Sequence, residues 1–471
     1  MRLSKIKSIA IAVLAVSAVY LTEQLWFEKI SSQDFLPSFM SGLSYTRAET
    51  GADKDYLVMP MRIVTDGGSG MYSIKYNQLS GWAGKAACDS AITAALKNGS
   101  AGSASALDWT GILSRPCFIY QYGFSMPADA FVLKFKQKNG ALTSRVKNFE
   151  DIAVFPAAPP GTPTGVSSGT SSGAASGISS ESVDVVFIDQ PGRMMYVYEI
   201  NGGQLAAQVW AALDGARRAG SFLYVSTSQS KLSPPDVNMF IPQSPDPYTY
   251  VHLSASNPYS GPGGVLYRNI IPLIGIFFDK PSSQWANNPD NYTFSDGSNF
   301  VRYYPSDVLE YDNYSVPEAG SASLFADDYG TAVAMISKDT AVTNEYYLAS
   351  CEESGARRVF SFDYAVNDFP VLVSDTFAQE IGLKHAIEVT VEQDRVVKYK
   401  KLVYNFSQGS AVSSANLHFQ QAFDSIARQS GGQKGITFDS VNIGYKAEKG
   451  SDIKLNWFIG VNSHMFVKGV E

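Results

Sequence analysis

An uncharged apolar stretch near the amino terminus limits what this chain can form more than any other feature. Residues 8–22 carry no charged side chain, Lys5 and Lys7 precede them, and a Trp-Phe pair follows a few residues later. A helix that spans a bilayer needs about 20 mostly apolar residues, and lysines at its start favour a cytoplasmic amino terminus. We therefore expect residues 1–30 to be a single-pass anchor in the cell membrane, with the bulk of the chain extracytoplasmic.

A cleaved signal peptide is the alternative to this anchor. Residues 16–18, Val-Ser-Ala, resemble a small-residue cleavage site after a short apolar run. The apolar character continues beyond that point through Leu21, Leu25 and Trp26, which favours an uncleaved helix. Both alternatives export the remainder. Residues 269–278 are also apolar, but they are too few to span a bilayer and contain a proline.

A stripe of small residues follows one face of the expected helix, namely Ser8, Ala12, Ala15 and Val19. Helices associate in lipid through close packing, which small residues at helical spacing permit. We therefore predict that this stripe contacts another transmembrane helix. The alternative is a helix that faces lipid and only tethers the chain.

Length, charge and cysteine content limit the remainder. A chain of 471 residues is too long for one ordinary core and predicts two or three domains after the anchor. The formal net charge of -7, without clustered Lys and Arg, argues against nucleic-acid binding. The three cysteines cannot form a closed disulfide framework. Cys88, Cys117 and Cys351 are expected to be small buried residues, and a single Cys88–Cys117 bridge stays open.

Composition shifts divide the chain. Residues 156–182 are rich in Pro, Gly and Ser and hold too few large apolar side chains to form a core, so they predict a flexible linker or a long loop. The expected division is a membrane anchor at 1–30, a stalk at 31–55, a first extracytoplasmic domain at 56–155, the linker at 156–182, a second domain at 183–321 and a C-terminal domain at 322–471.

Periodicity predicts an α+β fold. Hairpins are expected over residues 56–76 and at Gln393-Asp394, and helices over residues 86–98 and 204–219. Residues 116–125, 130–137 and 329–337 are expected to be strands. The order strand, strand, helix, strand in both later regions suggests two related α+β domains with antiparallel sheets after an unassigned first domain.

No motif of the chain predicts catalysis, a cofactor or a metal. A GTSSG pattern lies inside the Pro/Gly/Ser-rich segment, without the strand and helix that a nucleophile elbow needs. The four histidines, His252, His385, His418 and His464, lack zinc-site spacing. The carboxylate pairs Asp327-Asp328 and Glu352-Glu353 could serve as acid and base on a sugar, although adjacent acids on loops are usually only solvated.

A group of tyrosines is the remaining candidate for a binding surface. Tyr303, Tyr304, Tyr311 and Tyr314 lie close together in the sequence. Exposed rings of this kind can stack on carbohydrate or contact a protein. Packing within a β-sheet is the alternative that we favour for each of these rings, since tyrosine is common in strands.

Four stretches together resemble the YycH-type membrane regulators of the WalK (YycG) cell-wall sensor kinase in low-GC Gram-positive bacteria. They are KIKSIAIAVLAVSAVYLTEQLW at 5–26, YTFSDGSNFVRYYPSDVLEYDNY at 292–314, the segment FDYAVNDFPVL to IEVTVEQDRVVKYKKLV within 362–403, and LNWFIG at 455–460. The third stretch is also similar to YycI-type sister regulators. The first domain carries no motif of the family.

The resemblance implies a non-enzymatic regulator of a two-component sensor histidine kinase that controls cell-wall homeostasis. Such a protein acts through contacts of its transmembrane helix and its extracytoplasmic domains, with the kinase and a YycI-type regulator as partners. The alternative from the residues alone is an exported protein that binds or modifies cell-wall polysaccharide.

Overall fold

The structure of the protein is a computed structural model in which residues 55–471 form one compact unit. The residues described are 58–68, 70–76, 84–98, 104–135, 142–156, 182–219, 223–229, 238–243, 247–261, 264–265, 267–278, 284–288, 291–315, 323–367, 369–416, 419–429, 438–448, 452–461 and 464–469. The expected anchor and stalk, the stripe Ser8, Ala12, Ala15 and Val19, and residues 157–181 therefore lie outside the described residues. Among those described, no helix has the length and apolar character needed to cross a bilayer.

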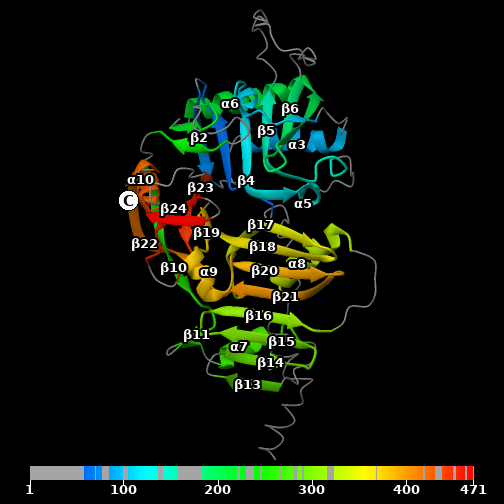
Figure 1. Cartoon of the computed structure of the whole chain (residues 1–471), viewed down its shortest axis with the longest axis vertical. Coiled ribbons are helices and arrows are strands. Elements are labelled where there is room, and N and C mark those ends of the chain that lie inside the picture. The colour runs from blue at the N-terminus through cyan, green and yellow to red at the C-terminus, as the bar shows by residue number, and fades with distance from the viewer. Residues whose placement is uncertain are drawn as a thin grey trace, which may run out of the picture. The chain divides into compact units, whose positions relative to one another are not determined.

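Nine strands form the first sheet, in the order β3-β7-β6-β5-β4-β1-β2-β8-β9, and all are antiparallel to their neighbours (Figure 1). Their bounds are β1 Arg62–Asp66, β2 Met71–Tyr76, β3 Ala104–Ala106, β4 Phe118–Pro127, β5 Asn148–Pro156, β6 Ser182–Asp189, β7 Met194–Asn201, β8 Tyr224–Ser226 and β9 Phe240–Pro242. The expected hairpin of β1 and β2 is confirmed.

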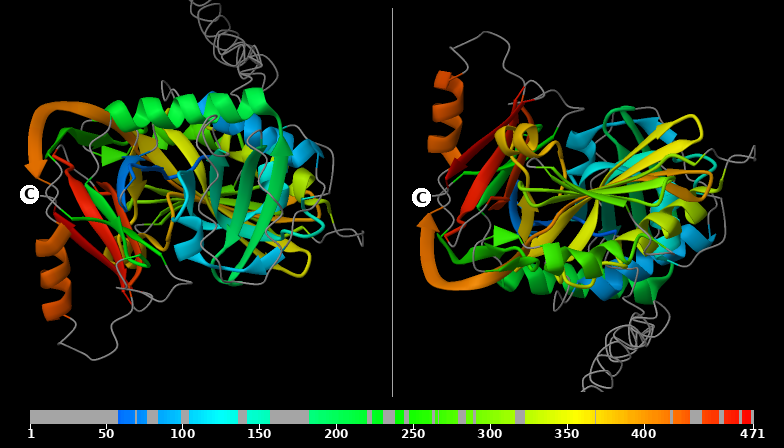
Figure 2. Two further views of the ribbon diagram at one scale, coloured as in Figure 1. Left: turned by 90° about the horizontal axis from the view of Figure 1, so that it is seen from above. Right: turned by 90° about the horizontal axis from the view of Figure 1, so that it is seen from below.

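Alternating side chains give this sheet two buried faces. Phe118, Ile152 and Phe187 belong to a core with the helices α3 (Lys85–Asn98) and α6 (Gly203–Ala219). Their chain neighbours belong to a separate core on the opposite face, which the short helix α4 (Trp109–Ile112) covers. Figure 2 shows α6, in green, lying across the strands. Both helices were predicted, because their apolar residues recur at helical spacing.

The division expected at residues 156–182 does not separate two domains. β5 ends at Pro156 and β6 begins at Ser182, and the two strands pair antiparallel along their length, from Asp151 opposite Ile188 to Pro156 opposite Val183. The sheet therefore continues across the predicted boundary, and the long-loop alternative fits this pairing. The boundary was predicted from amino-acid composition, and composition does not reveal which strands form hydrogen bonds with each other.

Twelve strands form the second sheet, along the path β13-β14-β15-β16-β21-β20-β18-β19-β23-β24-β25, with β17 paired to β18. Their bounds are β13 Gln284–Asn288, β14 Asn291–Ser295, β15 Asn299–Tyr304, β16 Val308–Asn313, β17 Glu345–Ser354, β18 Arg357–Val366, β19 Phe369–Leu372, β20 Ile387–Glu392, β21 Arg395–Leu402, β23 Phe438–Lys446, β24 Leu455–Val461 and β25 His464–Gly469. All pairs are antiparallel except β19 with β23. The predicted α+β class with antiparallel sheets is confirmed.

The boundary expected between residues 321 and 322 also falls within one sheet. β16 lies before it and β21 after it, yet they pair over five positions, from Val308 opposite Leu402 to Asp312 opposite Lys398. The two later regions therefore share a sheet and are not separate domains.

The hairpin of β20 and β21 turns where the sequence indicated. Gln393 and Asp394 have φ angles of 52° and 59°. Positive φ at both central residues is typical of a type I′ turn. The twist of this turn matches the right-handed twist of the two strands that it joins. The turn is further held by Asp328, whose carboxylate accepts a hydrogen bond from the Asp394 backbone N–H at 3.1 Å.

Two expected strands are helices instead. Residues 130–137 lie partly in α5 (Ala128–Lys134), and residues 329–337 lie almost entirely in α8 (Phe325–Ile336). In α5 the ring of Phe131 meets Phe149 edge to face at 5.1 Å, and Asp129 and Lys134 suit the two ends of a helix dipole. Short apolar runs do not distinguish strand from helix by periodicity, and here tertiary packing decided.

A long two-stranded ribbon and three further helices complete the described fold. β10 (Pro247–Ser256) pairs with β22 (Asn405–Asn416), and β11 (Ser260–Gly261) with β12 (Gly264–Val265). The helices are α7 (Tyr267–Ile274), α9 (Asp375–Ile381) and α10 (Phe419–Gln429). α10, in orange, lies beside the red strand β25 (Figure 2).

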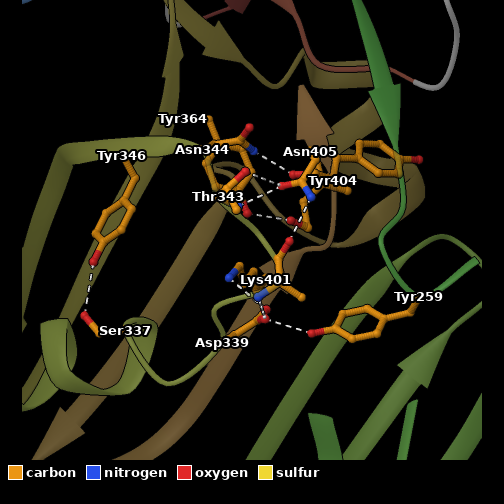
Figure 3. A network of polar contacts seen from close by, with 12 residues as sticks. Tyr259, Ser337, Asp339, Thr343, Asn344, Tyr346, Tyr364, Lys401, Tyr404 and Asn405 are labelled. Atoms are coloured by element: carbon orange, nitrogen blue, oxygen red, sulfur yellow. Dashed lines mark hydrogen bonds and ion pairs between the residues drawn. The ribbon is translucent and has the colours of Figure 1, made fainter. Parts of the chain in front are cut away.

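A buried ion pair ties β21 to the loop that follows α8. Lys401 Nζ donates to Asp339 Oδ2 at 2.9 Å, and the two side chains are 2% and 1% exposed. The same carboxylate group accepts from the Tyr259 hydroxyl at 2.8 Å and from the Ala341 backbone N–H at 3.1 Å. Figure 3 shows Asp339 between Lys401 and Tyr259. Three segments far apart in sequence therefore meet at one carboxylate.

We predict that Asp339→Ala lowers the free energy of unfolding by about 3–5 kcal/mol, because it leaves the Lys401 ammonium buried without its counter-ion. The measurement is urea-induced unfolding of residues 55–471. Asp214→Ala is the matched control, since Asp214 is 53% exposed in its ion pair with Arg218 and its removal should cost less than about 1 kcal/mol. Equal losses in the two variants would contradict the role assigned to the buried pair.

Candidate functional site

The larger of two polar cavities described below is a cleft of about 880 Å³ beside α9. One wall comes from β17, β18 and β20, a second from α9 and the turn that follows it, and a third from β23 and β24. Figure 1 shows α9 beside β19 and β20. The cleft therefore opens where the second sheet divides at β19, and polar side chains from several strands line it.

The sequence around α9 explains how the cleft obtains its charged side chains. Ser374 caps the helix by accepting the Phe377 N–H, and Gly382 ends it in the left-handed conformation with φ of 68°. A glycine at this position costs no side-chain strain, so the chain can turn sharply. Lys384 and His385 then follow directly and face the cleft.

The centre of the cleft is a histidine–aspartate pair. His385 Nδ1 lies 2.9 Å from Asp363 Oδ2, and the other Asp363 oxygen accepts the Ala386 N–H at 3.0 Å. Asp363 is 3% exposed, whereas the His385 side chain is 28% exposed. Burial opposes protonation of His385, but the charge of Asp363 and its hydrogen bond prevail and raise the pKa of the imidazole above its ordinary value. The pair is thus a titratable group that borders solvent.

Acidic side chains dominate the rest of the lining. Glu352, Asp375 and Glu388 border the cleft together with Asp363, against one ammonium from Lys384. Glu388 also accepts the Lys384 backbone N–H at 3.1 Å. Ser350, Ser361 and Ser440 line it too, but among the described residues no serine hydroxyl bonds to His385. The geometry supplies a polar binding surface and does not assemble the nucleophile that a hydrolytic triad needs.

The carboxylate pairs proposed as acid and base are divided between structural and surface positions. Asp328 is fully buried against Arg358 and accepts from Ser323, while its neighbour Asp327 is exposed. Glu353 pairs with Arg358 at 2.6 Å, and Glu352 alone reaches the cleft. The two carboxylates of each pair therefore do not face a common substrate position.

The histidines also lie apart. His252 is buried between Asp452 and Ser413, at 2.5 Å and 2.7 Å, and His385 lines the cleft. His418 lies outside the described residues, and His464 begins β25. Within the described part of the chain, no cluster of three potential metal-binding side chains occurs.

The cysteines are free and buried or half-buried. Cys88 and Cys117 belong to the two cores on opposite faces of the first sheet, so the bridge left open by the sequence does not form. Burial raises the thiol pKa of both well above the ordinary range and that of Cys351 to about 12. Thiols held neutral in this way are poor nucleophiles.

Most of the four tyrosines considered as a binding surface are buried or half-buried in the second sheet. Tyr303 and Tyr311 are buried within the second sheet, and Tyr304 is half-buried and donates to Glu310 at 2.6 Å. Tyr314 alone is exposed, at 62%. The described geometry therefore offers a single ring and no stacking surface.

Sequence reasoning missed Asp363, the residue that orients His385 from 22 positions away. One signal was present. Asp363 stands inside a mostly apolar strand, VFSFDYAV, where an unpaired carboxylate would be costly. A single acid in such a strand predicts a buried partner, although only the pairing of strands reveals which residue it is.

Comparison with known proteins supports one fold. No protein-family model and no curated protein matches the chain by sequence. Among solved structures, YycH from Bacillus subtilis is similar over 88% of this chain and 96% of its own, with 11% identity and a TM-score of 0.54. The chain has a YycH-type fold. The C-terminal domain of Bacillus megaterium YpeB covers 44% of the chain with 8% identity, at a TM-score of 0.26 that carries no weight.

The YycH-type fold confirms the resemblance indicated by the sequence. Three of the four stretches that carried it lie in the second sheet, where residues 292–314 contribute β14 to β16, residues 362–403 contribute β18 to β21, and residues 455–460 belong to β24.

We predict that His385 stabilises the fold in a pH-dependent manner. Because Asp363 raises the folded-state pKa above the ordinary value of about 6.5, the contribution is complete below that value and is lost as the pH rises through the folded-state pKa. The difference in unfolding temperature between wild type and His385→Gln should thus be largest near pH 5.5 and shrink towards about pH 8.5. Asp363→Asn should remove this pH dependence, and a constant difference would contradict it.

Proposed function

We propose that this protein is a non-enzymatic, membrane-anchored regulator of a two-component sensor histidine kinase of the WalK/YycG type, acting in cell-wall homeostasis. The observation that carries the proposal is the YycH-type fold over 88% of the chain. The amino-terminal apolar stretch, expected to anchor the chain with its folded part outside the cell, agrees with it. A YycI-type regulator is the second partner in this proposal.

The chemistry of the described residues supports a regulatory role. The cysteine thiols are held neutral, and Asp328 and Glu353 are engaged by Arg358. The cleft beside α9 instead offers a polar, mainly acidic surface, which suits the extracytoplasmic contact of a regulator. In the membrane, the stripe Ser8, Ala12, Ala15 and Val19 is the proposed contact with the kinase helices.

The first test changes the stripe. We expect Ala12→Leu with Ala15→Leu to change kinase phosphorylation by about threefold or more, because bulky side chains prevent close helix packing. The assay uses the full chain, the kinase and the YycI-type regulator in one membrane. Ala10→Leu with Ser17→Leu is the matched control, since at about 100° per residue these positions lie on the opposite face.

The control variant should leave kinase phosphorylation unchanged, and both variants should keep wild-type protein levels in the membrane. Unchanged phosphorylation in the stripe variant would remove the stripe from the mechanism. A photocrosslinker at Ala12 should capture the kinase or the YycI-type regulator, and capture of neither would contradict the proposed partners.

The second test addresses an exported wall-binding or wall-modifying protein, the alternative from the sequence. Residues 55–471, the compact unit, are incubated with purified cell wall. Our proposal expects neither depletion of the protein from solution nor release of wall fragments. Depletion would indicate wall binding, and released fragments would indicate an enzyme.

A further inference from the structure

A second cavity, of about 280 Å³, lies where the first sheet meets β23. Its walls come from β1, β4, β5, the residues around Gln190 and Asn238, and from Ser440 and Asn442 of β23. The pairing of β4 with β5 shifts register between Gln121 and Met126, and Gly123 adopts a φ of 75°. Such irregularities redirect a strand and often accompany binding sites.

A row of hydrogen-bonded polar side chains crosses the cavity wall. Arg62, Gln121 and Asp151 lie opposite one another on β1, β4 and β5. Arg62 Nε donates to Gln121 Oε1 at 2.7 Å, and its Nη1 donates to the Val441 carbonyl of β23 at 2.6 Å. Gln190 Nε2 donates to Asp151 Oδ2 at 2.7 Å. Asp151 therefore accepts hydrogen bonds from neighbouring glutamines, but burial outweighs these bonds and the charge of Arg62 and raises the pKa of Asp151 to about 6.

Glu150, the next residue, also accepts hydrogen bonds but has no counter-ion among the described residues. It lines the same cavity and accepts the Gln190 N–H at 2.8 Å, but no cation of the described residues forms an ion pair with it. Burial, followed by the negative charges of Asp151 and Asp189, raises the pKa of Glu150 to about 8. The described lining of the cavity thus holds two carboxylates, Glu150 and Asp151, and one cationic side chain, Arg62.

Asn238, which lines the cavity, carries a buried amide nitrogen without a hydrogen-bond partner among the described protein atoms. Asn238 is 4% exposed, and its Oδ1 accepts from Ser226 Oγ at 2.6 Å, from Ser228 N at 3.3 Å and from Ser228 Oγ at 3.1 Å. These donors fix which end of the amide is the oxygen. Nδ2, the other end, has no hydrogen-bond acceptor among the described protein atoms. An unsatisfied buried donor costs free energy unless a ligand or water supplies an acceptor.

We propose that this cavity binds a small monovalent ammonium compound that also carries a hydroxyl or carbonyl oxygen. The ammonium pairs with Glu150, and the oxygen accepts from Asn238 Nδ2. The two groups supply what each end of the ligand requires, and a cavity of about 280 Å³ has room for several water-sized groups.

This ligand would contact both sheets. Glu150 belongs to β5 of the first sheet, whereas Ser440 and Asn442 belong to β23 of the second. Ser440 also lines the larger cleft beside α9. A ligand bound in the cavity would thus affect the wall of that cleft through β23. The proposal goes beyond kinase regulation and stands independently of it.

The test compares two nearly isosteric probes by calorimetry on the full chain in detergent micelles. 4-Amino-1-butanol carries an ammonium and a hydroxyl, and 1,4-butanediol replaces the ammonium by a hydroxyl. We expect the amine to bind about ten- to hundredfold more tightly, since hydrogen bonds to charged groups are the stronger ones. Equal affinity of the two probes, or binding of neither, would overturn the proposal.

Two variants locate the site. Glu150→Gln keeps the shape of the side chain and should abolish the preference for the amine. Asp189→Asn is the matched control, because it removes a neighbouring carboxylate that does not line the cavity, and it should retain the preference. Retention in Glu150→Gln, or equal loss in both variants with unchanged unfolding temperatures, would overturn the assignment.

The pH dependence gives an independent readout. Ammonium binding requires ionised Glu150, whose neighbours are Asp151, Asp189, Gln190 and Ser125, with Arg62 beyond Asp151. Below about pH 8 the affinity should fall by up to tenfold per pH unit, and binding near pH 7 should release a proton. Affinity independent of pH between about 6 and 8 would exclude Glu150 as the counter-ion.

Comparing 4-amino-1-butanol with n-butylamine, which lacks the oxygen, tests Asn238. The hydroxyl should strengthen binding severalfold in the wild type and not in Asn238→Ala. An equal gain from the hydroxyl in both proteins would exclude Nδ2 as its donor.

Discussion

The pairing of β16 with β21 is the interaction on which the second sheet depends. It joins β13 to β16 to the strands that follow α8, and without it the sheet would separate into two pieces. Charge reinforces the hydrogen bonds. Glu310 on β16 lies opposite Lys400 on β21 at 3.4 Å, and Lys398 approaches the same carboxylate at 3.2 Å. Opposite charges facing each other across strands stabilise one register over its neighbours.

The second sheet divides at β18 and β19. β18 pairs with β20 near its start and with β19 near its end, and β19 then pairs in parallel with β23. Gly444 on β23 permits the close approach, since a Cβ there would lie 2.7 Å from the Pro370 carbonyl oxygen. Both polar cavities border β23, so they lie where the sheets divide and meet.

Such an arrangement fits the regulatory role proposed above. Apolar cores make each sheet rigid, whereas the junction holds His385, Glu150 and other titratable groups whose charge responds to pH or to a ligand. A change there can alter how surfaces on the two sheets present themselves to a neighbour.

The sequence by itself determined the local features. The type I′ turn at Gln393-Asp394, the helix faces of α3 and α6 and the antiparallel α+β class follow from backbone preferences and apolar periodicity, which act over a few residues. Only the tertiary structure decided how far each sheet extends, that residues 130–137 and 329–337 lie mainly in helices, and that Asp363 meets His385. Strand pairing and buried ion pairs join residues tens to hundreds of positions apart, and no local pattern in one chain specifies those partners.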